Sequence, residues 1–143
     1  MEQNTEFVTA VAKIKGCGMS ARKMRLVADV VRSNDVESAL ATLRFTKKEA
    51  ARWLEKLLTS AIANWSVLTG EEADDYNLKV SAIWVDQGPQ LKRFRPAPHG
   101  RAHRIRKHTC HVTLQVTNTV AMEQAVQEVV EEDMEENVIE ETE

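Results

Sequence analysis

The sequence has few cysteines and no long apolar run, and these absences exclude several classes of protein. Its 143 residues include two cysteines, Cys17 and Cys110, without C-x-x-C spacing. That usage fits a reducing, cytoplasmic setting better than a disulfide scaffold. No apolar run approaches the ~18 residues of a membrane span, and no basic start followed by an apolar run marks the N-terminus. We therefore expect no membrane partner and no secretory signal, and the length suits one domain.

Charge of one sign is missing from two stretches. Acidic residues are absent from 36 consecutive positions, 87–122, and basic residues are absent from 119–143. Residues 1–118 hold all 19 Lys and Arg against 12 Asp and Glu, a formal charge of +7, whereas residues 119–143 hold ten acidic residues, a charge of −10. Such a split is typical of proteins with charged partners. We expect a basic domain over 1–118 and an acidic C-terminal tail over 119–143.

The tail allows two interpretations. Ten like charges favour a disordered, solvated segment, which is our prediction. A helix is the alternative, because apolar residues recur every four positions, at Met122, Val126, Val130, Met134 and Val138.

Apolar periodicity and turn residues predict both helices and strands. Strands are predicted over 6–14, 78–85 and 111–116, with Gly16 and Gly18 ending the first. Helices are predicted over 21–32, from Asp35 onward, and from a Thr46–Glu49 capping box to Gly70. We interpret the three tryptophans as core residues rather than ligand platforms: Trp53, Trp65 and Trp84.

Cations gather on two of the predicted helices. Ser20 is expected to cap the first helix. Arg22, Lys23 and Arg25 follow it in the first turn, where positive charge opposes the helix dipole. That cost indicates that these charges serve a partner. On the long helix, Lys48, Arg52 and Lys56 are spaced four apart and form a basic ridge.

The stretch from Gly88 to Val112 holds seven Lys or Arg, all four histidines and all three prolines. Its centre, Pro96–Gly100, has turn chemistry, and cations flank it on both sides. We predict a long antiparallel hairpin arm over about 84–112 with its tip at 96–100. At ~3.3 Å per residue, about 12 residues would let it reach roughly 40 Å.

The predicted arm points to nucleic acid. A two-stranded arm cannot bury enough apolar area to be stable alone, and its unpaired cations repel one another. Nucleic acid supplies negative charge along the whole length, and each phosphate contact releases counterions. Five of the seven cations are Arg, whose planar fork suits phosphate, and Phe94 among them can stack on a base. A solvated basic loop is the alternative.

No motif predicts an enzyme, a metal site or a cofactor. The sequence "HTCH" (108–111), with His103 nearby, invites a zinc interpretation. Arg104 and Arg106 would share a strand face with His108 and Cys110, however, and cations beside a metal are unfavourable. No Ser/His/Asp or paired-carboxylate arrangement stands out.

Three stretches resemble the bacterial L-twenty-two family of large-subunit ribosomal proteins. They are "MSARKMRLVADVVR" (19–32), "TSAIANW" (59–65) and "VDQGPQLKRFRPAPHGRAHRIRKHTCHVTLQV" (85–116). The resemblance implies an α+β fold, in which three helices pack on a small three-stranded antiparallel sheet and two strands extend into a long hairpin. It also implies a structural protein of the large subunit that is located in the cytoplasm.

The resemblance further implies partners. These are several domains of large-subunit rRNA, neighbouring large-subunit proteins and the nascent polypeptide, which the hairpin tip meets by lining the exit tunnel. It implies support of subunit assembly, no cofactor and no homo-oligomer. A free-standing regulatory nucleic-acid-binding protein is the alternative; it would recognise a short site and have little need of a long arm.

Site residues follow from the resemblance by position. The implied rRNA contacts are Ser20, Arg22, Lys23, Arg25, Lys92, Arg93, Arg95, Arg101, Arg104, Arg106 and Lys107. The implied tunnel-lining tip is Pro96, Ala97, Pro98, His99, Gly100 and Arg101. The tip departs from the family, which usually has basic residues where Ala97 and His99 stand, so two fixed charges are lost there. The acidic tail is a second departure, and we hypothesise that it masks the basic domain before assembly.

Overall fold

The structure, a computed structural model, describes residues 7–119 and confirms the α+β class. In this part of the chain the helices are α1 (Ala21–Val31), α2 (Val36–Phe45) and α3 (Glu49–Thr69), with short 3-10 turns η1 (Ala73–Tyr76) and η2 (Pro98–Gly100). The strands are β1 (Thr9–Cys17), β2 (Leu78–Gln87), β3 (Leu91–Ala97), β4 (Arg101–Lys107) and β5 (Cys110–Asn118). Apart from Thr119, the predicted acidic tail lies outside the described residues.

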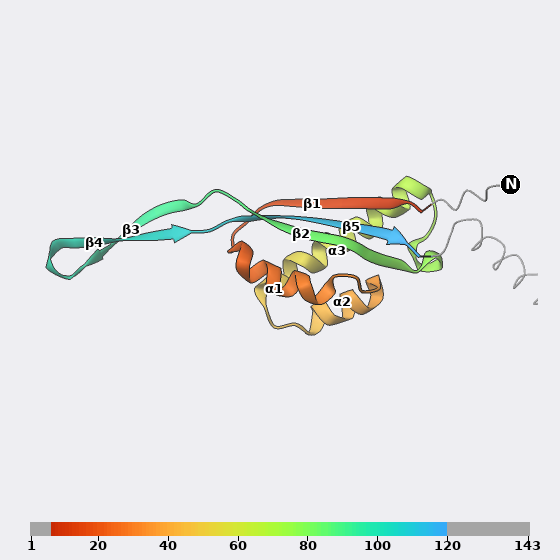
Figure 1. Cartoon of the computed structure of the whole chain (residues 1–143), viewed down its shortest axis with the longest axis horizontal. Coiled ribbons are helices and arrows are strands. Elements are labelled where there is room, and N and C mark those ends of the chain that lie inside the picture. The colour runs from red at the N-terminus through yellow and green to blue at the C-terminus, as the bar shows by residue number, and fades with distance from the viewer. Residues whose placement is uncertain (1–6, 120–143) are drawn as a thin grey trace, which may run out of the picture.

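A three-stranded antiparallel sheet with the order β1-β5-β2 forms the body together with the helices. The first and last strands pair directly, with Thr9 opposite Thr117. Figure 1 shows the helices gathered against one face of this sheet, where α3 contacts β1 and β5 and α1 contacts β2. The core between them is mainly aliphatic, with Trp65 fully buried and its ring 5.3 Å from that of Tyr76.

The helices follow the predicted apolar pattern. In α1 the buried residues are Ala21, Met24, Val27, Ala28 and Val31, and in α3 they are Ala50, Ala51, Leu54, Leu57, Leu58, Ala61 and Trp65. Gly70 ends α3 in the left-handed conformation, as predicted. The predicted capping box is wrong, because α3 begins after Lys48 and the Thr46 hydroxyl donates to the Thr42 carbonyl at the end of α2.

A register shift in β2 changes which side chains face the core. The shift lies between Val80 and Ala82, and the next buried residue is Ile83. Strict alternation from Leu78 would point Trp84 inward, but after the shift Trp84 lies on the opposite face, 41% exposed. The prediction that Trp84 belongs to the core is therefore wrong.

A second register shift lets β1 continue past the point where the sequence predicted its end. It lies between Ile14 and Cys17, and Gly16 within it has a φ of 74°. Such a conformation favours glycine, so Gly16 allows a bulge rather than ending the strand. The Gly16 N–H donates to His111 Nδ1 on β5 at 2.9 Å, which ties the bulge to the central strand.

Strands β3 and β4 pair with each other from Leu91–Lys107 to Ala97–Arg101 and form a separate two-stranded sheet. Figure 1 shows this hairpin projecting from one end of the body. We call β3, η2 and β4 the arm. At its base the Gly88 N–H donates to the Thr109 carbonyl at 2.9 Å, and the Thr109 hydroxyl donates to the Pro89 carbonyl at 2.7 Å. These two bonds tie together the two chain segments that connect the body to the arm.

We expect Gly88→Ala to lower stability, because a Cβ at Gly88 would overlap the Thr109 hydroxyl oxygen and lie 3.2 Å from His111 Nε2. The expected loss is about 1–3 kcal/mol, measured by chemical denaturation. Gly18→Ala is the matched control, since a Cβ there meets nothing within 4 Å. Equal stability of the two variants would show that the arm base tolerates the added methyl group.

Candidate nucleic-acid interface

The arm exposes both of its faces. Every residue of β3 and β4 is exposed except Ala97, which is partly buried. Lys92 lies opposite Arg106, and Phe94, 73% exposed, lies opposite Arg104. These four residues share one face by strand alternation, whereas Arg93, Arg95, Arg101 and Lys107 share the other. All seven predicted arm cations are therefore brought together on two sides of one ribbon.

Among residues 7–119, no acidic side chain forms an ion pair with a cation of the arm. The nearest acid before it in the chain is Asp86, and none follows before position 123. Directly opposed cations such as Lys92 and Arg106 destabilise an isolated strand pair. The arm is thus a cationic surface that gains stability from a polyanion laid along it.

The tip turns through residues with little fixed charge. His99 has a φ of 60° and Gly100 a φ of 70°, so the turn uses two successive left-handed residues. Pro98, His99 and Gly100 are exposed, and Arg101 is the first cation after the turn. The end of the arm is therefore less basic than its flanks.

The start of α1 lies at the base of the arm. Ser20 occupies the predicted N-cap position, but its hydroxyl makes no capping bond. Arg25 donates from Nε and Nη2 to the Val85 carbonyl at 3.2 and 2.7 Å, close to the end of β2 that leads into the arm. Arg22 and Lys23 are exposed beside it. The cations at the start of α1 therefore continue the basic surface of the arm, although two N–H groups of Arg25 are already bonded to the Val85 carbonyl.

The ridge on α3 also lies toward the arm end of the body. Lys48, Arg52 and Lys56 are all exposed. The other end of α3 lies beside the start of β1, where Asn64 Nδ2 donates to the Val11 carbonyl at 3.0 Å and Trp65 Nε1 to the Val8 carbonyl at 3.3 Å. Since β1 runs toward the arm, the first turns of α3 point the same way.

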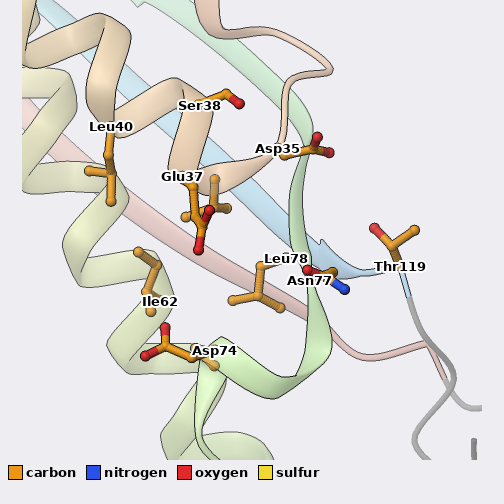
Figure 2. Close-up of a pocket in the computed structure, with 11 residues that line it drawn as sticks. Asp35, Glu37, Ser38, Leu40, Ile62, Asp74, Asn77, Leu78 and Thr119 are labelled. Atoms are coloured by element: carbon orange, nitrogen blue, oxygen red, sulfur yellow. The ribbon is translucent and has the colours of Figure 1, made fainter. Parts of the chain in front are cut away.

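Acidic residues gather at the opposite end of the body. A pocket of about 440 Å³ lies there, beside Thr119, and none of its lining residues is Lys, Arg or His. Figure 2 shows carboxylates and apolar side chains around it: Asp35, Glu37, Asp74, Leu40, Ile62 and Leu78. Its negative charge makes this end a poor surface for nucleic acid, so the described body is electrically polarised along its length.

The two cysteines, far apart in the sequence, lie opposite each other. Cys17 on β1 pairs in register with Cys110 on β5, and both are free and buried. Burial raises the pKa of the Cys110 thiol to about 11, and the neighbouring Cys17 adds to the increase. Burial also raises the pKa of Cys17. Both thiols therefore stay protonated at neutral pH and serve as core side chains.

The described residues form neither a metal-binding cluster nor a membrane-spanning helix. Within residues 7–119, no group of three or more His, Cys, Asp or Glu is placed to hold a metal ion. Across the same residues, no helix is long and apolar enough to span a membrane. Cys110 faces the core while His108 is exposed, so the "HTCH" residues do not converge.

An exposed cationic arm on a small α+β body suits a polyanion-binding structural protein. Residues 12–117 match the family described as ribosomal protein L22p/L17e. The chain is 58% identical to the large ribosomal subunit protein uL22 of Christiangramia forsetii over 107 residues, which cover 73% of this chain and 78% of the relative. It is 52% identical to the uL22 of Flavobacterium psychrophilum, covering 79% and 85%, and 53% identical to that of Bacteroides fragilis, covering 73% and 77%.

The chain therefore belongs to the ribosomal protein L22p/L17e family. The family is one of structural ribosomal proteins and not of enzymes, which confirms the prediction of a non-catalytic protein.

We expect Arg25→Gln to destabilise the protein, since it removes a charged donor from the Val85 carbonyl. The loss should be about 1.5–3 kcal/mol in chemical denaturation. The matched control is Arg22→Gln, expected to change stability by no more than about 0.5 kcal/mol, because Arg22 is exposed. If the two variants were equally stable, Arg25 would not hold α1 to β2.

Proposed function

We propose that this protein is a structural component of the cytoplasmic large ribosomal subunit that binds large-subunit rRNA through its arm. The observation that carries the proposal is the arm itself, which has seven exposed cations and no acid on two open faces. Such a ribbon is stabilised when phosphates surround it on both sides. The names of its relatives, large ribosomal subunit protein uL22, support the same partner.

The start of α1 extends the proposed rRNA contact onto the body. Ser20, Arg22 and Lys23 present a hydroxyl and two cations beside the base of the arm. Arg25 can add to them with the guanidinium donors that it does not use on Val85. Contacts from two directions would hold several rRNA segments together, which is how the protein would support subunit assembly.

The tip is proposed to line the polypeptide exit tunnel and to meet the nascent chain. This role comes from the family resemblance and is supported by the exposure of residues 98–100 at the far end of the arm. With Ala97 and His99 in place of basic residues, the tip would present a more neutral surface to the passing polypeptide. The remaining proposed partners are neighbouring large-subunit proteins, and we propose neither a cofactor nor a homo-oligomer.

The arm proposal is tested with large-subunit rRNA transcribed in vitro. Lys92, Arg104 and Arg106 share one face of the arm, and we expect their joint replacement by Gln to weaken binding and to flatten the log-log salt dependence by roughly 0.7–0.9 per lost phosphate contact. The comparison variant removes the same charge from the α3 ridge by replacing Lys48, Arg52 and Lys56, and it should flatten the slope less than the arm variant does. An unchanged slope in the arm variant would contradict the proposal.

The same measurement separates the ribosomal role from the regulatory alternative. A ribosomal protein should prefer folded large-subunit rRNA to any short fragment of it. A regulator should bind one short site with undiminished affinity, and that result would favour the alternative.

The acidic tail is proposed to mask the cationic surfaces before assembly. Removing residues 120–143 leaves every described residue in place and takes away ten negative charges. We expect the truncated protein to associate faster with rRNA at low salt and to be less soluble when free. Equal association rates in stopped-flow measurements would contradict the masking role.

A further inference from the structure

The sheet face opposite the helices, which we call the open face, exposes a set of side chains that the sequence did not predict. By alternation, Thr9, Val11 and Lys13 of β1 point to this face, because Ala10 and Ala12 are buried in the core. On β5 the corresponding residues are His111, Thr113, Gln115 and Thr117, and on β2 they include Lys79, Trp84 and Asp86. Trp84 and Val11 are the exposed large apolar residues here, at 41% and 38%.

One row across the three strands places a cation and an aromatic ring on the two outer strands of the sheet. Lys13 on β1 lies opposite Thr113 on β5, and Thr113 lies opposite Trp84 on β2. Thr113 is only 7% exposed although it points to the open face, so the side chains on either side cover most of it. The Trp84 indole and the Lys13 side chain therefore form the exposed surface on either side of Thr113.

The charge of the open face favours a polyanion. Lys13 and Lys15 are exposed at the half of this face nearer the arm, and Asp86 is the one acidic residue on the described strands of this sheet. The face also continues into the arm, because β2 and β5 lead directly into its two strands. An exposed indole on a sheet face that also carries lysines and continues into a cationic arm fits a nucleic-acid strand with an unstacked base better than it fits an apolar protein surface.

We propose that the open sheet face is a second RNA contact, in which Trp84 stacks on an unpaired base of the large-subunit rRNA and Lys13 contacts an adjacent phosphate. The inference rests on the proposed rRNA-binding function and adds a single-stranded segment to what the arm binds. The contributions of Trp84 and Lys13 to the affinity can be measured separately. Stacking depends little on salt, whereas phosphate contacts depend on it strongly.

The test compares Trp84→Leu with Trp84→Phe in the full chain bound to large-subunit rRNA transcribed in vitro. Trp84→Leu should weaken binding roughly 5- to 150-fold without changing the salt slope, because it removes one base stack. Trp84→Phe keeps an aromatic ring and should restore most of the affinity. Lys13→Gln should instead flatten the salt slope by about 0.7–0.9.

Fluorescence supplies a second readout on the same proteins. Trp65 is buried and Trp53 partly buried, so a stacked base should quench chiefly the emission of Trp84. We expect quenching on adding a single-stranded oligoadenylate, and its loss in Trp84→Leu. Thermal unfolding of each variant confirms that the body is folded.

The outcomes distinguish this inference from the arm proposal. If the arm variant loses affinity while Trp84→Leu binds as tightly as the parent, the open face is not an RNA contact and the arm proposal stands. If Trp84→Leu weakens binding and the arm variant does not, the arm proposal fails and the sheet contact stands. Equal losses in Trp84→Leu and Trp84→Phe, with both proteins folded, would also overturn base stacking.

Discussion

The pairing of β5 with both β1 and β2 holds the body together and sets where the arm leaves it. The central strand joins the first strand of the body to the strand that enters the arm, and its inward residues Val112, Leu114 and Val116 lie at the centre of the core. Because β2 and β5 also provide both connections to the arm, their register decides how the arm leaves the body. The hydrogen bonds of Gly88 and Thr109 then fix the point of departure.

Two bulges change which side chains of β1 and β2 face the core. The shift beside Gly16 in β1 lets the strand bring Cys17 into the core opposite Cys110. The shift beside Ser81 in β2 moves Trp84 from the core side to the open side. The sheet therefore keeps an unbroken aliphatic layer against the helices while it presents a ring and lysines on the other face.

Local patterns in the sequence predicted most of the fold, because helix periodicity, Gly70 and the turn at 96–100 depend on near neighbours. They could not predict the bulges, because a register shift depends on a partner strand more than thirty residues away. At Trp84 the local pattern is ambiguous, because Val80, Ala82 and Trp84 follow one apolar alternation while Ile83 and Val85 follow the other. The sequence alone could not exclude the capping box at Thr46, because the Thr46 hydroxyl donates to a carbonyl of α2 that only the fold brings within reach. The arm cations were visible from charge alone, whereas the second role of Arg25 needed the position of Val85.

The pairing of the first described strand with the last has a consequence for the order of synthesis. Thr9 meets Thr117, so the sheet cannot close until nearly all of the basic domain has been translated, and the arm is made before its own base can form. Throughout that interval the cations of the arm have no finished body behind them. The residues that are translated after β5 include ten acidic ones, between positions 123 and 143. The chain thus receives its own counter-charge at about the moment when the domain becomes able to fold.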